Sequence, residues 1–323
     1  MERRRPVREY LAVAVTLVLG ACTAAPPAAS PTPTAVPTPS PVPTTTPSES
    51  PAPIPPFEAA RAHAFVRELA ALGPRETTSA TYRRASALVA ERFRALGYAV
   101  EFQRFDVPAG NVDEIQVASG STRNVVARPA GSDPRAPHLV IGGHLDTVPD
   151  SPGANDNGSG IGTLLEIARL ATLRPPPMPV VFVAFAAEER RRQSEDRSTL
   201  FLGALEYLDR MSPAERDSLR GMINLDMIGN GEEVLVLGGR GPISAALLAA
   251  AERRGVPARP STVADRFSDH QAFREAGYPV GWLWAGDHPS LHRPDDTIAV
   301  IQRPMLRRAG TVAWEALRRL RLE

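Results

Sequence analysis

Residues 137–146 read Pro-His-Leu-Val-Ile-Gly-Gly-His-Leu-Asp, an apolar run that ends in a histidine and an aspartate. Two later apolar runs have the same form: residues 179–187 lead into Glu188-Glu189, and residues 222–225 lead into Asp226. Short apolar runs of this kind are consistent with buried strands. In open α/β sheets, ligands bind beyond the carboxyl ends of the strands, where several loops converge. We therefore expect an α/β fold in which three strands aim charged side chains at one place.

Between the first two runs, residues 153–160 read Gly-Ala-Asn-Asp-Asn-Gly-Ser-Gly, a turn-rich stretch that opens a helix. Taken alone, Asp156 in this stretch is explained as a carboxylate near a helix N-terminus. It belongs, however, to a larger set of acidic side chains that the strand ends and this loop would bring together. That set is Asp146, Asp156, Glu188, Glu189 and Asp226.

Such a crowd of buried carboxylates would suffer like-charge repulsion unless a cation neutralised it. His144 and His292 add two imidazoles. This combination of nitrogen and oxygen ligands suits zinc, with manganese or cobalt tolerated. The economical solution is a pair of metal ions that share one bridging carboxylate.

The first 21 residues have the pattern of a secretory signal, with four arginines before an apolar run, Leu11–Ala21, that is too short to span a bilayer comfortably. The run ends in Leu-Gly-Ala-Cys, which resembles the bacterial lipobox; this resemblance implies cleavage before Cys22 and lipid attachment to it. Cys22 is the only cysteine, so it has no internal disulfide partner. We expect a protein anchored by lipid at the extracytoplasmic face of a bacterial membrane; the alternative is an ordinary signal peptide with an incidental cysteine.

Thirteen of the 33 prolines fall between Pro26 and Pro56. This stretch has too little apolar bulk to form a core, so we interpret residues 22–56 as the lipidated cysteine and an extended linker. Residues 57–323 have the composition of one domain of about 270 residues. Four Arg and two Glu among residues 1–21 contribute +2 to the net charge of +1, which leaves −1 for the remainder. No nucleic-acid partner is indicated.

Six motifs of the domain follow one another in the order found in a known family. They are His144-x-Asp146, Asn155-Asp156-Asn157-Gly158-Ser159-Gly160, Ala187-Glu188-Glu189, Asn224-Leu225-Asp226-Met227-Ile228-Gly229, Ser268-Asp269-His270 and His292-x-Pro294-x-Asp296-Thr297. Together they resemble the co-catalytic zinc aminopeptidases of clan MH, of the bacterial aminopeptidase S and yeast aminopeptidase Y type. The resemblance covers nearly all of residues 57–323, including Leu-Gly-Pro-Arg at 72–75.

The resemblance implies a three-layer α/β/α fold with a mixed, mostly parallel sheet, and a dinuclear zinc site that removes N-terminal residues from peptides. It assigns one zinc to His144 and Asp226 and the other to Glu189 and His292, with Asp156 as the bridge. Two further residues receive roles. Glu188 matches the general base that takes a proton from the attacking water, and Asp146 matches the carboxylate that orients His144.

The chain departs from the family pattern at two places. Leu291 stands where family members often carry a tyrosine that assists the oxyanion. Residues 190–197 form a charged insert that begins with three arginines, where a short glycine-rich turn is expected. This insert is either a solvated loop or a rim that favours acidic substrates. We expect His270 to support the site or line the substrate pocket rather than bind metal, and Trp282 and Trp284 to be core residues.

Three alternative functions remain open. The carboxypeptidase branch of the clan also has a His-x-Asp motif, but only 65 residues separate Asp226 from His292, too few for the lid domain of that branch. Glutaminyl cyclase, an acyltransferase of similar fold that uses one zinc, shares the acidic pair and the Ser-Asp-His element. A lipoprotein that only stores or presents zinc is the third alternative, and the presence of Glu188 argues against it.

Overall fold

The computed structural model describes residues 55–191, 200–262 and 268–322. The predictions about the leader and Cys22, and nearly all of the predicted linker, lie outside these residues. In the described part of the chain, no helix is long and apolar enough to cross a membrane.

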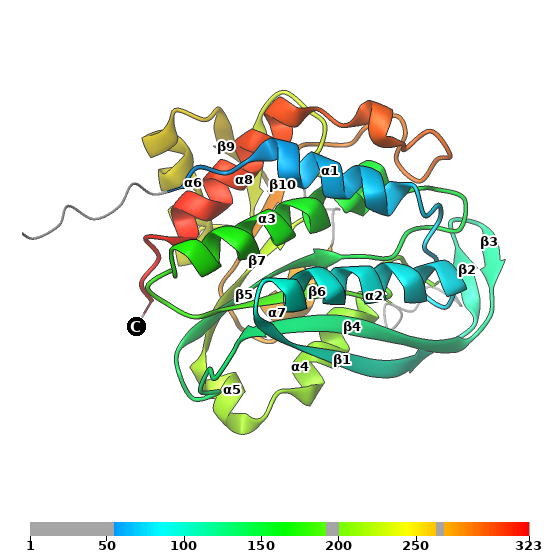
Figure 1. Cartoon of the computed structure of the whole chain (residues 1–323), viewed down its shortest axis with the longest axis horizontal. Helices are drawn as coiled ribbons and strands as arrows, with labels where there is room; N and C mark the ends of the chain where they lie inside the picture. The colour runs from blue at the N-terminus through cyan, green and yellow to red at the C-terminus, as the bar shows by residue number, and fades with distance from the viewer. Residues whose placement is uncertain (1–54, 192–199, 263–267, 323) are drawn as a thin grey trace, which may run out of the picture. The chain divides into compact units, whose positions relative to one another are not determined.

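An eight-stranded sheet forms the centre of the fold, with the strand order β1-β4-β6-β5-β7-β10-β8-β9 (Figure 1). Its strands are β1 (Tyr98–Val107), β4 (Gly120–Pro129), β5 (His138–His144), β6 (Val180–Phe185), β7 (Leu219–Leu225), β8 (Val234–Leu237), β9 (Ala258–Pro260) and β10 (Val280–Trp284). A separate hairpin consists of β2 (Gly110–Val112) and β3 (Ile115–Val117).

The three apolar runs that end in charged side chains form the middle of this sheet. β5 pairs in parallel with both β6 and β7, β7 pairs in parallel with β10, and β8 pairs in parallel with β9. Antiparallel pairs join β1 to β4, β4 to β6 and β8 to β10. The prediction of a mixed, mostly parallel sheet is therefore confirmed, and the carboxyl ends of β5, β6 and β7 lie at the same edge.

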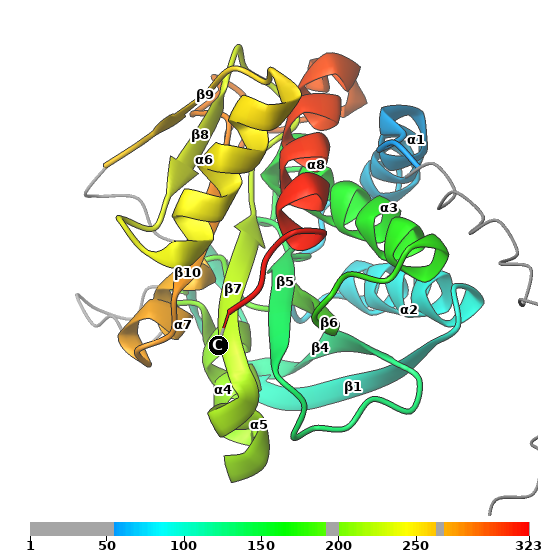
Figure 2. The same ribbon diagram turned by 90° about the vertical axis from the view of Figure 1, so that its left-hand side faces the viewer.

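Helices cover both faces of the sheet (Figures 1 and 2). They are α1 (Ala59–Ala70), α2 (Ala80–Ala95), α3 (Ser159–Leu173), α4 (Leu202–Arg210), α5 (Pro213–Ser218), α6 (Pro242–Arg254), α7 (His270–Glu275) and α8 (Arg303–Leu317). Along β5, Leu139 and Ile141 belong to the core cluster under α1, α2, α3, α6 and α8, whereas Val140 belongs to the cluster under α4 and α7. This alternation is the period of a strand buried on both faces, so the three expected layers are present.

Helix α2 illustrates how the local sequence determines where a helix begins and ends. α2 begins where the Ser79 side chain accepts a hydrogen bond from the backbone nitrogen of Tyr82 at 2.9 Å. Its buried face includes Ala85, Val89 and Phe93. The helix ends before Gly97, whose φ of +87° is readily adopted only by glycine.

Arg75, from the Leu-Gly-Pro-Arg motif, connects this helical layer to the edge of the sheet that carries the charged residues. Its side chain is fully buried. The guanidinium donates to the carbonyl oxygens of Leu145 and Gly153, both at 3.0 Å, and to that of Pro152. Its backbone nitrogen donates to Oγ1 of Thr147 at 2.8 Å. One side chain therefore fixes the loop that follows β5.

Replacing Arg75 by methionine should lower the free energy of unfolding by about 3–5 kcal/mol, because three buried carbonyl groups lose their donor. Urea denaturation measures the change. Arg61→Met is the matched control: Arg61 pairs with Glu58 at 2.9 Å on the surface, with both side chains about half exposed, and its loss should cost about 0–1 kcal/mol. Equal effects of the two substitutions would contradict the role given to Arg75.

Candidate metal centre

Two imidazoles face one shared carboxylate at the edge of the sheet. His144, the last residue of β5, has its Nε2 3.1 Å from Oδ1 of Asp156 and 3.4 Å from Oδ1 of Asp226. Nε2 of His292 lies 3.3 Å from Oδ2 of Asp156 and 3.3 Å from Oε2 of Glu189. Asp156 thus directs one oxygen at each imidazole. The five predicted ligands come together in the two groups that the family resemblance implied, with Asp156 common to both.

A second aspartate, Asp296, fixes the backbone of the loop that carries Asp156. Oδ1 of Asp296 accepts a hydrogen bond from the backbone nitrogen of Asn155 at 2.8 Å, and Oδ2 accepts one from that of Asp156 at 3.0 Å. The carbonyl oxygen of Asp296 also accepts from the backbone nitrogen of Ala154. Asp296 follows His292 by four residues, so one segment supplies a predicted ligand and fixes another.

The same loop is joined to the end of β7, which carries Asp226. Nδ2 of Asn157 donates to the carbonyl oxygen of Leu225 at 2.8 Å, and Oδ1 of Asn155 accepts from the backbone nitrogen of Gly229 at 2.9 Å. The backbones approach so closely that a β-carbon at Gly160 would overlap with the carbonyl oxygen of Leu225. The asparagines and glycine of this motif are therefore explained by the contact between the two loops.

Asp146 organises the acidic pair that follows β6. Its Oδ1 accepts from the backbone nitrogen of Glu188 and its Oδ2 from that of Glu189, both at 3.2 Å. Its carboxylate is farther from His144, 3.9 Å from Nδ1, and the nearer partner of Nδ1 is the backbone carbonyl of Asp146 at 3.1 Å. The residue predicted to orient His144 thus contacts it chiefly through its main chain, and its carboxylate positions Glu188 and Glu189.

Backbone strain accompanies this arrangement. Ala187, which precedes the acidic pair, Met227, which follows Asp226, and His292 itself all have positive φ, at 54°, 51° and 59°. Such values are uncommon for residues other than glycine and tend to occur where a site constrains the chain.

The carboxylates control the pKa values of both imidazoles. Burial alone would lower the pKa of His144, but the negative charges around it, Glu188 foremost, raise it well above its usual value. Burial also opposes protonation of His292, and hydrogen bonds to Asp156 and Glu189 outweigh it and raise the pKa to about 11. Around neutral pH, the protein groups alone would therefore keep protons on both rings, and a metal ion would have to displace them.

Burial acts in the opposite direction on the acids. It raises the pKa of Asp146 to about 7 against the opposing charge of His144. It raises the pKa of Glu188 well above its usual range, and the pKa of Asp269 likewise. Each proton on these groups relieves the like-charge repulsion that a cation would otherwise relieve.

The residues present fit a divalent metal. His144, Asp156 and Glu189 offer ligand atoms within 4.8 Å of one another, and so do His144, Glu188 and Asp226. Oε1 of Glu189 and Oδ1 of Asp226 are buried and have no hydrogen-bond donor among the described residues. Buried polar atoms are normally satisfied, so each of these two oxygens is available to bind a ligand.

Three residues that shape the site received no role from sequence reasoning. They are Arg75, Asp296 and Asp269. All three lie within the family motifs, but the partners of Arg75 and Asp296 are 70 to 141 residues away in the chain. Asp269 is fully buried, and neither of its carboxylate oxygens has a hydrogen-bond partner among the described residues. The charge of Asp269 contributes to the raised pKa of Glu188.

The neighbours of the site follow the predictions in part. The ring of His270 is buried and packs on Trp282, with ring centroids 4.9 Å apart. Trp282 and Trp284 are buried, as expected of core residues. Leu291, at the position of the missing tyrosine, packs against the apolar cluster that contains both tryptophans. An apolar surface therefore lies next to His292, in place of a hydroxyl donor.

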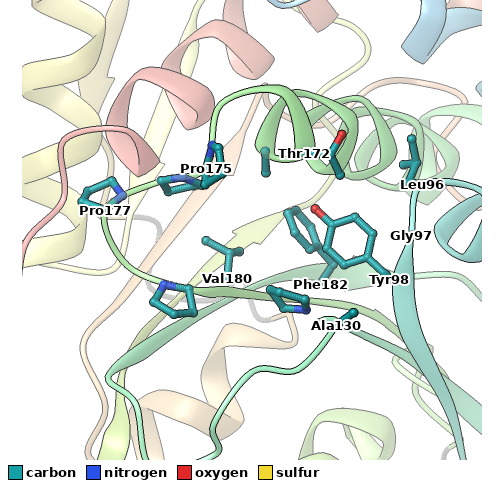
Figure 3. A pocket seen from close by; sticks show the side chains of 13 residues that line it. Leu96, Gly97, Tyr98, Ala130, Thr172, Pro175, Pro177, Val180 and Phe182 are labelled. Atoms are coloured by element: carbon teal, nitrogen blue, oxygen red, sulfur yellow. The ribbon is translucent and has the colours of Figure 1, made fainter.

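A pocket of about 470 Å³ lies at the other end of β6 (Figure 3). Its lining is apolar and includes Pro175, Val180 and Phe182. Tyr98 is its only titratable side chain, and the Tyr98 hydroxyl already donates to the carbonyl oxygen of Ala168 at 2.9 Å. This pocket lacks the groups that hydrolysis or metal binding needs.

The model of peptidase family M28 matches residues 124–317, more than half of the chain. The protein belongs to peptidase family M28. The matched residues include both imidazoles and all the predicted carboxylate ligands.

The curated relatives of similar sequence include proteins named aminopeptidases. The M28 chain is 32% identical over 212 residues to Aminopeptidase YwaD of Bacillus subtilis, covering 61% of this chain and 44% of that protein. It is 31% identical over 246 residues to Leupeptin-inactivating enzyme 1 of Streptomyces exfoliatus, covering 73% and 51%. It is 31% identical over 231 residues to the Probable lipoprotein aminopeptidase LpqL of Mycobacterium tuberculosis, covering 58% and 43%. The chain thus spans about half the length of these relatives.

Solved structures agree on the fold. BSAP, a zinc aminopeptidase from Bacillus subtilis, superposes with a TM-score of 0.70 at 20% identity, covering 81% of this chain and 94% of that one. Tannerella forsythia glutaminyl cyclase superposes with a TM-score of 0.69 at 20% identity, covering 83% and 100%. The predicted zinc exopeptidase fold is confirmed. Because the chain resembles both proteins, the fold alone does not distinguish an aminopeptidase from a glutaminyl cyclase.

The affinity for Zn²⁺ should rise with pH between about 6 and 8, because the raised pKa values of His144, His292 and Glu188 mean that binding must release protons. Asp146, with a pKa of about 7, adds a group that titrates within this range. Isothermal titration in two buffers of different ionisation enthalpy measures the number of protons released. A Zn²⁺ affinity that does not change with pH would contradict the placement of the metal among these groups.

Proposed function

We propose that this M28 protein is a dinuclear zinc aminopeptidase. The observation that carries the proposal is the position of Asp156, whose two carboxylate oxygens lie 3.1 Å and 3.3 Å from the two imidazoles. One carboxylate between two sets of ligands is the arrangement of a bridge between two metal ions. Family membership and the aminopeptidase names of two relatives support hydrolysis of peptide bonds.

In this proposal, His144 and Asp226 hold one zinc, Glu189 and His292 hold the other, and Asp156 is shared. Bound zinc would polarise the scissile carbonyl group and lower the pKa of the attacking water. Manganese or cobalt could serve in its place. The requirement for two ions rather than one is part of the proposal.

Glu188 is proposed as the general base. Its carboxylate offers an oxygen within 4.8 Å of the ligand atoms of His144 and Asp226. Burial raises its pKa, so it accepts a proton from water more readily than an exposed glutamate would and can later deliver that proton to the leaving amine. The bonds from the backbone nitrogens of Glu188 and Glu189 to Asp146 hold the base in register with its neighbouring ligand.

We also propose that residues 1–21 are a lipoprotein signal peptide and that Cys22 is lipidated. The proline-rich stretch to residue 56 would then tether the peptidase domain to the extracytoplasmic face of a bacterial membrane. The leader pattern and the lipobox-like Leu-Gly-Ala-Cys support this proposal. The name of the relative LpqL, a probable lipoprotein aminopeptidase, also supports it. Stable anchoring needs more than one acyl chain, which a lipoprotein cysteine would provide.

A glutaminyl cyclase activity is the second candidate, because glutaminyl cyclases are among the structural neighbours. A site for a single metal would use only one of the two ligand groups joined by Asp156. The paired geometry favours the peptidase, and incubation of Gln-peptides, with ammonia release as the readout, separates the two activities.

Glu188→Gln should retain both metal ions and lose about 10²–10⁴-fold in kcat on an aminoacyl-anilide, because the amide cannot accept the proton of the attacking water. Elemental analysis gives the metal content and a chromogenic assay gives the rate. Glu206→Gln is the control, since Glu206 lies in a surface pair with Arg210 and should leave the rate unchanged. Full activity of Glu188→Gln would exclude it as the base.

Aminopeptidase activity requires a free substrate amine. Zinc-loaded protein should hydrolyse free aminoacyl substrates and lose nearly all activity on their N-acetylated forms, because acetylation removes the ammonium group. The ratio of kcat/KM between the two forms is the measurement. Efficient cleavage of the N-acetylated substrates, or of C-terminal residues, would instead favour an endopeptidase or a carboxypeptidase.

A further inference from the structure

The arginine-rich insert after Glu189 does not act as one unit. Arg191 is almost completely buried, and its Nε donates to the carbonyl oxygen of Pro108 at 2.8 Å. Its two terminal nitrogens donate to the carbonyl oxygen of Ala118 and to the carboxylate of Glu76. Pro108 and Ala118 are the two ends of the segment that contains the β2–β3 hairpin. Arg191 therefore fixes this hairpin beside the acidic pair, and its burial keeps it away from substrate.

Arg190, its neighbour, has the opposite surroundings. It is half-buried and lines a pocket of about 300 Å³ whose other lining residues include Glu189 and His292. Its Nε is buried without a hydrogen-bond acceptor among the described residues. A buried donor without a partner is costly, so the guanidinium is prepared for an acceptor that the described protein residues do not provide.

The pocket is also lined by acidic side chains, which would repel a negatively charged ligand unless their own charges are solvated or paired. Asp113 and Glu114 lie at the turn of the hairpin and are exposed to solvent. Asp113 has a partner of its own, since its Oδ1 lies 3.8 Å from Nδ1 of His292. Water can solvate both exposed carboxylates, whereas it does not reach the buried Nε of Arg190. Two charged side chains of this pocket have a buried atom that lacks a partner among the described residues, Oε1 of Glu189 and Nε of Arg190. The proposed metal site assigns Glu189 to a metal ion, which leaves the Arg190 guanidinium to bind a substrate group.

We propose that Arg190 binds a carboxylate of the substrate next to the metal centre and makes the enzyme prefer acidic peptides. This proposal rests on the proposed peptidase function and specifies its substrate class. A guanidinium recognises a carboxylate through two parallel hydrogen bonds, which an amide of the same shape cannot match. The carboxylate comes either from the C-terminus of a dipeptide or from an Asp or Glu side chain beside the scissile bond.

Three pairs of substrates test the proposal and distinguish these sources. Ala-Ala against Ala-Ala-amide tests the terminal carboxylate, Ala-Glu-amide against Ala-Gln-amide tests a side chain on the leaving residue, and Glu-anilide against Gln-anilide tests the N-terminal side chain. The wild-type protein should prefer the carboxylate member of at least one pair by about 10- to 100-fold in kcat/KM. Arg190→Gln should reduce this ratio to near 1, and Arg190→Lys should give an intermediate ratio.

Arg135→Gln is the matched control, because Arg135 is exposed and its backbone nitrogen, not its side chain, makes its recorded hydrogen bond. It should keep the wild-type ratio. Ratios near 1 in all three pairs for the wild type, a preference for the amides, or a preference that survives Arg190→Gln would overturn the inference. Absence of hydrolysis for every substrate, with two zinc ions bound, would instead overturn the proposed function on which it rests.

Discussion

The contact between Asp156 and the two imidazoles is the constraint on which the rest of the site depends. Five acidic side chains and two histidines occupy one buried edge of the sheet, and their like charges would drive them apart without opposing interactions. The fold opposes this repulsion with uncharged donors: Asp296 and Asp146 each accept two backbone N–H groups. The carboxylates are thereby fixed in place before any cation binds, which is the preorganisation that a metal site requires.

This requirement explains why loops, rather than strands, contain most of the irregular backbone. β5, β6 and β7 are buried on both faces and are regular apart from a register shift at the start of β5 and a positive φ at Gly221. Next to the site, positive φ values occur just beyond β6 and β7, at Ala187 and Met227. The regular strands supply rigidity, and the strained residues turn the chain so that adjacent side chains can serve different roles. Glu188 and Glu189 are such a pair, one proposed as base and the other as ligand.

The ends of β5, β6 and β7 could be predicted from sequence because each is a local pattern, an apolar run followed by a polar side chain. The predicted ligands follow from that pattern together with the family motifs. The supports could not be predicted in the same way. The bond between Asn155 and Asp296 spans 141 positions, and the bond between Arg191 and Glu76 spans 115. A local sequence pattern cannot predict hydrogen bonds between residues so far apart in the chain. The sequence therefore predicts which ligands lie together, but not the hydrogen bonds that position them.

The three consecutive arginines after Glu189 give a second example of what the sequence alone cannot predict. In the sequence, Arg190 and Arg191 are equivalent positive charges on one loop. The sequence therefore predicts one role for the whole insert, either a solvated loop or a charged rim. Their surroundings differ: Arg191 is buried against the β2–β3 segment, whereas Arg190 lines the pocket that contains His292. Once Arg191 is buried against Pro108, Ala118 and Glu76, Arg190 must face away from that contact, and the direction left to it is the pocket beside His292. The burial of Arg191 thus determines that the Arg190 side chain lies in the pocket.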